Sequence, residues 1–176
     1  WRFKIREGLY FVDCQGNLTD APINAHTVEF TAKMALDPIQ VNRAGDNMQT
    51  QLTIVNAKAY YTQKDSNTVS WDDVGIKAID DYTIELTLAV ASNARNVMKQ
   101  FTGYATCPVP EEMYLSLMSA DGTSTEYGTA VDKTLYSGAF YCVDWVKEST
   151  TTVRKNPYYC HADLIKLNEV VHWYVP

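Results

Sequence analysis

The sequence lacks the motifs that mark the common catalytic and metal-binding sites. It has no glycine-rich phosphate loop, no GxSxG nucleophile elbow and no HExxH zinc motif. No two cysteines form a CxxC pair and the histidines are widely spaced, so the ligand spacings of a zinc or redox site are missing. The residues concerned are Cys14, Cys107, Cys142, Cys160, His26, His161 and His172. We therefore expect no catalytic residue, no metal site and no cofactor.

Long apolar runs and an excess of basic charge are absent as well. No stretch approaches the roughly 18 apolar residues of a membrane-spanning helix. The chain has 15 basic and 21 acidic residues, a formal net charge of -6, and this argues against a nucleic-acid partner, which would need a basic patch. No signal peptide is recognisable, and the chain opens on Trp1 rather than Met. We therefore expect a processed chain or an excised fragment.

What the sequence does have is the composition of a globular fold. Hydrophobic residues make up 46% and charged residues 20%, which is ordinary for a chain that buries a core. The length of 176 residues suits one domain or two small ones. Short helical and strand patterns alternate without the regular rhythm of a doubly wound sheet, which predicts an α+β, or mixed α/β, fold.

Hydrophobic periodicity locates the expected elements. Strands are predicted on both sides of Glu7-Gly8, in hairpins over residues 74–89 and 137–159, and near the C-terminus. Helices are predicted from the cap Asn24 to Asp37-Pro38, over residues 92–100, and from Pro110 onward. Residues 48–64 fit a helix less clearly, Ser70 is expected to cap one short turn, and residues 13–22, 39–47 and 121–134 are expected to be loops.

An adjacent acidic pair, Asp80-Asp81, separates two alternating runs in "VGIKAIDDYTIELTLA". Paired carboxylates can act as acid and base or hold a metal, but Asp is also common in turns because it bonds nearby backbone groups. Adjacent residues of an extended chain point to opposite faces, whereas catalytic carboxylates meet across a cleft. The pair therefore predicts a hairpin turn. Glu111-Glu112 similarly indicates a helix start, where acids complement the dipole, rather than a glycosidase site.

Four motifs, in the same order, resemble family 5 of the bacterial solute-binding proteins, which feed peptide and nickel ABC importers. The first stretch, "WRFKIREGLYFVDCQGNLTDAPINAHTVEFTAKMALDP", is similar to the family pattern in two parts. The matching residues are Phe3, Ile5, Arg6, Gly8, Phe11, Asp13, Pro22, Ile23, Ala25 and Val28. Asn24 stands where the family usually has Thr, and Cys14-Gln15-Gly16 contains an insertion before the Gly.

The remaining motifs extend the resemblance across nearly the whole chain. "VGIKAIDDYTIELTLA", "CPVPEEMY" and "YSGAFYCVDWVKESTTTVRKNPYY" are each similar to a family segment. The match of the last of these stretches rests on Gly138, Phe140, Trp145, Asn156, Pro157 and Tyr159. Ala139 replaces the usual Pro, and Cys160 stands where the family often has Trp.

The resemblance implies a fragment of a periplasmic-binding-protein type II fold. Family members are much longer, with two ligand-clamping lobes and an extra small domain. Residues 1–91 would form most of the small domain, and residues 92–176 the central portion of the first lobe. The second lobe, which carries the acidic partner of the peptide N-terminus in the family, would lie outside the chain.

The function implied by the resemblance is binding, not catalysis. The whole protein would be an extracytoplasmic lipoprotein, in the periplasm or lipid-anchored on the outer face of the cytoplasmic membrane. It would bind oligopeptides or dipeptides and deliver them to a membrane permease, and its lipid anchor would lie outside this segment. Alternatives within the fold are a nickel chelate, haem or an oligosaccharide as ligand. An alternative of another class is an independent β-rich adhesion or carbohydrate-binding module.

Residues 101–108 line the cleft in relatives, so Gly103 and Tyr104 are the candidate ligand-binding residues; Tyr104 is equally well explained as a surface loop tyrosine. Trp145 is expected to pack on an apolar face with Tyr141 and Val143, the alternative being a platform on which ligand stacks. An extracytoplasmic location permits disulfides. We expect at least one and favour Cys107–Cys142, although the sequence alone leaves three connectivities, or four free thiols, open.

Overall fold

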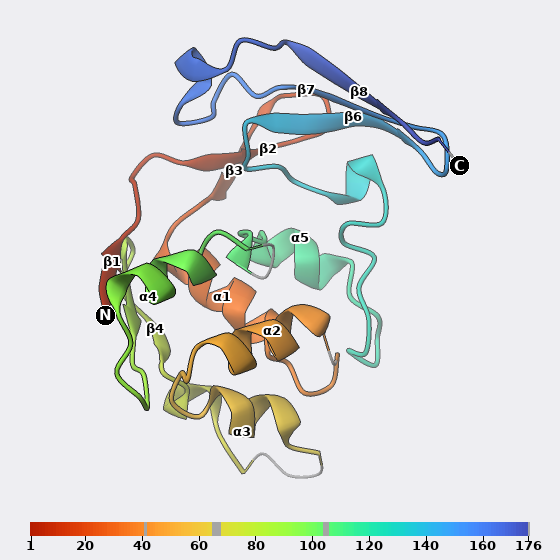
Figure 1. The fold of residues 1–176 in the computed structure, drawn as a ribbon. Helices are drawn as coiled ribbons and strands as arrows, with labels where there is room; N and C mark the ends of the chain where they lie inside the picture. Colours follow the sequence, from red (N-terminus) through yellow and green to blue (C-terminus); the bar gives the residue numbers. More distant parts are fainter. Residues whose placement is uncertain (41, 65–67, 104–105, 176) are drawn as a thin grey trace.

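The computed structural model describes residues 1–40, 42–64, 68–103 and 106–175. Helices and short strands alternate along the chain, as the sequence predicts (Figure 1). The strands are β1 (Arg2–Lys4), β2 (Tyr10–Val12), β3 (Leu18–Pro22), β4 (Ile76–Asp80), β5 (Thr83–Leu86), β6 (Phe140–Val146), β7 (Thr150–Lys155) and β8 (Glu169–Trp173). The α-helices are α1 (Ala25–Ala35), α2 (Arg43–Gln51), α3 (Ala57–Thr62), α4 (Ala94–Gln100) and α5 (Glu111–Ser116).

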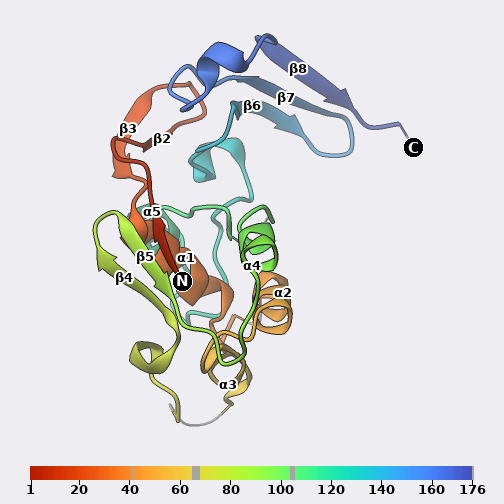
Figure 2. The same cartoon turned by 60° about the vertical axis from the view of Figure 1, so that its left-hand side comes forward.

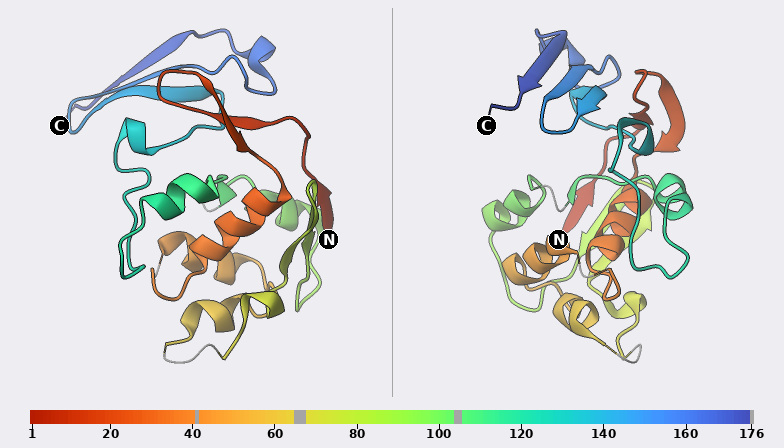
Figure 3. Two further views of the ribbon diagram at one scale, coloured as in Figure 1. Left: turned by 180° about the vertical axis from the view of Figure 1, so that it is seen from behind. Right: turned by 90° about the vertical axis from the view of Figure 1, so that its right-hand side faces the viewer.

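The strands form separate antiparallel sheets, ordered β1-β5-β4, β2-β3 and β6-β7-β8 in the described residues. Figure 1 shows the helices and the β1-β5-β4 sheet in one body, and the other two sheets in a thinner layer above it. The sheet of the lower body lies along one side of α1 (Figure 2). The N-terminus lies in the lower body, and the C-terminus at the far tip of the upper layer (Figure 3).

Helix α1 is the central element of the lower body and begins where the sequence predicts. The Asn24 side chain accepts a hydrogen bond from Thr27 N at 3.0 Å, and Thr27 Oγ1 faces Asn24 N in return, which completes a capping box. One side of α1 packs against β4 and β5, and another contacts α2 and α5. The main core lies between these elements and includes Leu36, Ile84 and Val97, all of them fully buried.

The acidic pair forms the turn between β4 and β5, so the prediction for it is confirmed. Asp80 accepts hydrogen bonds from Tyr82 N at 2.9 Å and from Thr83 Oγ1 at 2.7 Å. These bonds, that from Thr83 foremost, lower the pKa of Asp80. The carbonyl oxygen of Asp81 accepts from Ala25 N at 2.8 Å. The turn therefore joins the hairpin to the first turn of α1 and has a structural role.

The helix expected over residues 48–64 is wrong as a single element. Helix α2 begins earlier, at Arg43, and ends before Leu52, while α3 begins only at Ala57. Between them Ile54 forms a bridge to Leu88, and Asn56 adopts a left-handed conformation with φ of 58°. Asn tolerates that conformation better than most residues, so the chain turns there and places Leu52 and Ile54 in the core.

The loop expected at residues 13–22 contains a strand that the sequence pattern did not predict. Asp13 Oδ1 accepts hydrogen bonds from Gln15 N and Asn17 N, at 2.9 and 2.8 Å, so the turn residues are set by one aspartate. The strand β3 that follows pairs with β2 across a register shift. None of its five residues is buried, and the exposed Leu18, Asp20 and Pro22 alternate with half-buried Thr19 and Ala21, so the strand has no hydrophobic face for periodicity to detect.

A β-bulge in β6 changes the face that Trp145 occupies. Tyr141 is paired with Arg154 and Trp145 with Thr151, and the register shifts between Cys142 and Asp144. Arg154 and Thr151 are three positions apart, so Tyr141 and Trp145 lie on opposite faces of the sheet. Trp145 is 50% exposed. The expected common apolar face is therefore wrong, because the extra residue of the bulge reverses the alternation.

All four cysteines are free thiols in the structure, so the expected Cys107–Cys142 bridge is not formed. Burial foremost, followed by the neighbouring Asp144 and Cys14, raises the pKa of the Cys142 thiol. The structure describes no helix with the length and apolar character needed to cross a membrane.

The division expected at residue 91 stays a prediction about a longer protein. Within this chain, residues that follow position 91 pack against residues that precede it. Val97 of α4 belongs to the core formed with α1 and β5, and Val12 of β2 pairs with Tyr136 through two backbone hydrogen bonds of 2.9 and 2.8 Å.

Candidate functional site

The segment that leaves helix α4 carries the described half of the predicted site. Asn93 Oδ1 caps α4 by accepting from Asn96 N at 2.9 Å, and the buried Val97 fixes the helix on the core. After the helix, the Thr106 amide and hydroxyl both donate to Gly103 O, at 3.2 and 3.0 Å. Gly103 is therefore held in a compact turn. Tyr104 lies outside the described residues.

An aromatic pair secures the same segment to the sheet. The rings of Phe101 and Phe3 have centroids 5.2 Å apart and are tilted by 52°, a favourable arrangement for two aromatic side chains. Phe3 belongs to β1, which pairs with β5. The end of α4 is thus anchored on the β1-β5-β4 sheet rather than projecting freely into solvent.

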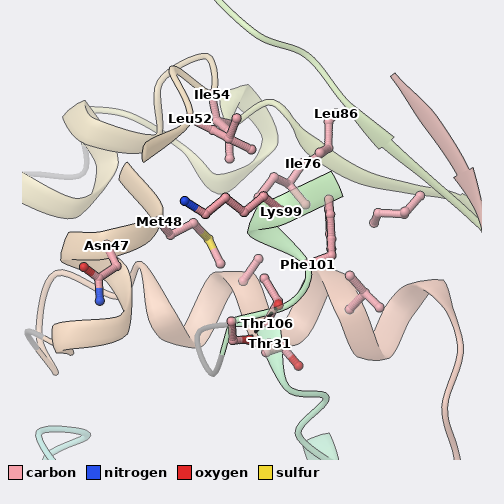
Figure 4. A pocket seen from close by; sticks show the side chains of 14 residues that line it. Thr31, Asn47, Met48, Leu52, Ile54, Ile76, Leu86, Lys99, Phe101 and Thr106 are labelled. Atoms are coloured by element: carbon pink, nitrogen blue, oxygen red, sulfur yellow. Dashed lines mark hydrogen bonds between the residues drawn. The ribbon is translucent and has the colours of Figure 1, made fainter. Parts of the chain in front are cut away.

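Between these elements lies a pocket, which we call the α4 pocket. It is lined by residues of α1, α2 and the β4–β5 hairpin, by Leu52 and Ile54 after α2, and by Lys99, Phe101, Gly103 and Thr106. Its volume is about 90 Å³. Figure 4 shows side chains of Met48, Leu52, Ile54, Ile76 and Leu86 converging on it. The pocket is mostly apolar because it continues the main core outward to the surface.

The polar groups of the α4 pocket are few and differ in character. Thr31 Oγ1 donates to Thr27 O at 2.8 Å and accepts from Val109 N at 2.9 Å, so internal bonds engage it. Lys99 is exposed, and Figure 4 shows its side chain reaching across the pocket toward Met48 and Asn47. No carboxylate in the described part of the chain lies within ion-pair distance of its ammonium group.

A second hollow, wider and acidic, lies between β3 and the N-termini of α1 and α5. Its lining residues include Asp20, His26, Glu111 and Glu112. Helix α5 begins at Glu111, so the interpretation of the acidic pair as a helix start is confirmed. Among the described residues there is no group of three or more His, Cys, Asp or Glu side chains that could hold a metal ion.

These features are suited to binding through burial of apolar surface with one charged group. Gly103, which the sequence predicts as a site residue, lines this pocket, whereas Lys99 and the other lining residues were not predicted. Hydrophobic periodicity assigns Met48 and Leu52 to a helical face, but the pocket depends on the break between α2 and α3. The one local signal was Asn56, which adopts a left-handed conformation immediately before α3 begins.

Comparison with known proteins identifies the family. The family described as bacterial extracellular solute-binding proteins, family 5 Middle, matches residues 1–176. The chain belongs to this family. The resemblance found in the sequence motifs is therefore confirmed, and the fold is that of substrate-binding proteins.

Individual relatives agree with the family 5 assignment. The oligopeptide-binding protein OppA of Bacillus subtilis (strain 168) is 26% identical over 171 residues, covering 97% of this chain and 27% of the relative. The probable deoxycholate-binding periplasmic protein YgiS of Escherichia coli (strain K12) is 28% identical over 168 residues, covering 96% of this chain and 28% of the relative.

A solved structure confirms the expected fold class. Listeria monocytogenes OppA bound to peptide superposes with a TM-score of 0.79 at 23% identity, covering 99% of this chain and 30% of that chain. The mixed α/β arrangement is therefore that of an oligopeptide-binding protein. This chain of family 5 spans less than a third of the length of the relatives that it matches.

Proposed function

We propose that the chain is a segment of the substrate-binding component of an ABC importer, and that the whole protein binds oligopeptides or dipeptides outside the cytoplasmic membrane. The observation that carries this proposal is the family match over the whole chain. The names of the Bacillus subtilis and Listeria monocytogenes relatives support peptides as the ligand class. The β-rich adhesion or carbohydrate-binding module has no support from these matches.

The proposal includes a second lobe that this chain does not contain. Closure of two lobes would bury an extended peptide, main-chain hydrogen bonds would supply affinity, and wet pockets would tolerate different side chains. The partners would be the peptide and a membrane permease, and a lipid anchor outside this segment would hold the protein at the membrane. We propose Gly103 and Tyr104 as contributions of this segment to the cleft.

The ligand class distinguishes the proposal from its alternatives and can be tested directly. A nickel chelate, haem or an oligosaccharide are alternatives on the same fold, and the name of the Escherichia coli relative adds deoxycholate. The test is native mass spectrometry of the full-length protein for a co-purified ligand, followed by calorimetric titration with tri- to pentapeptides and with each alternative. Released peptides and micromolar peptide binding would support the proposal. Tight binding of one alternative, with no peptide bound, would overturn it.

A further inference from the structure

We propose that the α4 pocket is a binding subsite for a branched aliphatic group that carries a nearby carboxylate, with the carboxylate paired to Lys99. The inference rests on the proposed function, because it names a ligand chemistry for a pocket in a solute-binding chain. It adds a site within this segment that requires no residue of a second lobe.

The size and lining of the pocket set the apolar part of the ligand. A cavity of roughly 150 Å³ lined by aliphatic and aromatic side chains can hold benzene. The α4 pocket, at about 90 Å³, is smaller. It therefore has room for a branched alkyl group such as the side chain of leucine, isoleucine or valine. Met48, Ile54, Ile76 and Leu86 would contact such a group.

The charge of the pocket sets the polar part of the ligand. Among the described residues, Lys99 is the one charged residue that lines it, and its ammonium group has no carboxylate partner in the same part of the chain. Thr31 has its hydroxyl engaged on both sides. A cationic ligand would be repelled, and a neutral carbonyl would accept only a weaker hydrogen bond from Lys99. A carboxylate beside the alkyl group would form a charge-assisted hydrogen bond at the edge of an apolar surface.

Two sources supply this chemistry. The C-terminal residue of a peptide ending in leucine, isoleucine or valine carries both groups, and so does a free branched-chain fatty acid. N-acetyl-leucine represents the first source and 4-methylpentanoate the second. The matched neutral probe is 4-methylpentanamide, which has the same alkyl group and no charge.

The test is an amide chemical-shift titration of the 176-residue chain, repeated in the longer protein that contains it. We expect both acids to shift the signals of Ala32, Met48 and Ile54, with millimolar Kd. Lys99→Gln should weaken binding of the acids at least fivefold and change binding of the amide much less. The control Lys58→Gln removes an exposed lysine of α3 that does not line the pocket and should change neither.

Each outcome of the titrations either supports the proposed subsite or contradicts it. Tighter binding of N-acetyl-leucine would assign the subsite to peptide C-termini, and tighter binding of 4-methylpentanoate would assign it to free fatty acids; both support the shared chemistry. No shifts at the pocket at probe concentrations of about 20 mM, well above a millimolar Kd, would overturn the inference. Equal affinity of Lys99→Gln and the unaltered chain for the acids would do the same. Neither result would affect peptide binding by the full-length protein, which the titrations under Proposed function measure separately.

Discussion

At the scale of single residues, the sequence predicts the role of a side chain when the groups that it contacts are close to it along the chain. Asn24 and Asp80 accept hydrogen bonds from backbone amides within three residues, and Glu111 lies in the first turn of α5, so their positions could be predicted from the sequence. Lys99 and Met48 meet across a pocket built from segments far apart in the sequence. No local pattern specifies that meeting, and the sequence could not predict it.

Trp145 gives the first test at this scale. Replacing a completely buried large aromatic residue by Ala lowers the free energy of unfolding by about 3–5 kcal/mol. Trp145, however, is 50% exposed and lies on the face that the bulge reverses. We expect Trp145→Ala to lower the free energy of unfolding of this chain by about 1–2 kcal/mol, less than half the buried value. Phe11→Ala, at a fully buried position, should cost about 3–5 kcal/mol. Urea denaturation of both variants measures the difference, and equal losses would show that Trp145 is buried in solution.

At the scale of elements, most helices and hairpins were predictable because their boundaries carry caps, turns or prolines. The strand β3 and the break between α2 and α3 were not. Strand β3 pairs only with β2 in the described residues, and its side chains are largely exposed, so it has no hydrophobic alternation to detect. The break depends on Ile54 reaching Leu88, a contact between distant segments.

The approach of α2 to α1 is set by Gly45 and gives a second test. A Cβ atom at this position would lie 2.0 Å from Ala35 O and 2.8 Å from the Tyr61 ring. Gly→Ala in a helix usually stabilises by about 1 kcal/mol, but here the backbone contact reverses the sign. We expect Gly45→Ala to destabilise the chain by about 2 kcal/mol or more. In the control Gly138→Ala the nearest atom is 3.9 Å away, so a change of only about 0.5 kcal/mol is expected. A urea midpoint for Gly45→Ala at or above that of the unaltered chain would contradict this close approach.

The contact between α5 and the loop after it gives a pH-dependent test. Burial raises the pKa of Tyr127 to about 12, and its hydroxyl donates to Leu135 O at 3.2 Å. The value in the unfolded chain is about 10, so the neutral phenol stabilises the fold. This contribution is complete below about pH 10 and is lost as the pH rises through about 12.

We therefore expect the urea midpoint of the unaltered chain to fall more steeply between pH 10 and pH 12 than that of Tyr127→Phe. Absorbance at the phenolate band follows the ionisation in parallel. Tyr158→Phe serves as the control, because Tyr158 is half-exposed and its removal should leave the slope unchanged. If Tyr127→Phe has the same slope as the unaltered chain, the phenol is not buried in the folded state.

At the scale of the whole molecule, the order of motifs along the chain predicted the family and the fold class, and both are confirmed. The arrangement of the elements in space was harder to predict from the sequence. Strands β2 and β3 lie beside β6 in the upper layer, while α4 and α5 return to the lower body (Figure 1). Exposed aromatic residues at the tip of the upper sheet, Trp145 and Trp173, stand on opposite faces. Their exposure is consistent with a chain that spans less than a third of its relatives.

We expect this chain alone to have a low affinity for peptides, because it spans less than a third of the length of its relatives. A peptide held against one wall keeps most of its water, and the α4 pocket has room for one branched side chain. We expect tri- to pentapeptides to bind the chain no more tightly than about 1 mM, equivalent to about 4 kcal/mol. Calorimetric titration of the chain, with the full-length protein as the positive control, measures this directly. Micromolar binding by the chain alone would mean that one wall suffices, and that closure of a second lobe is not the source of affinity.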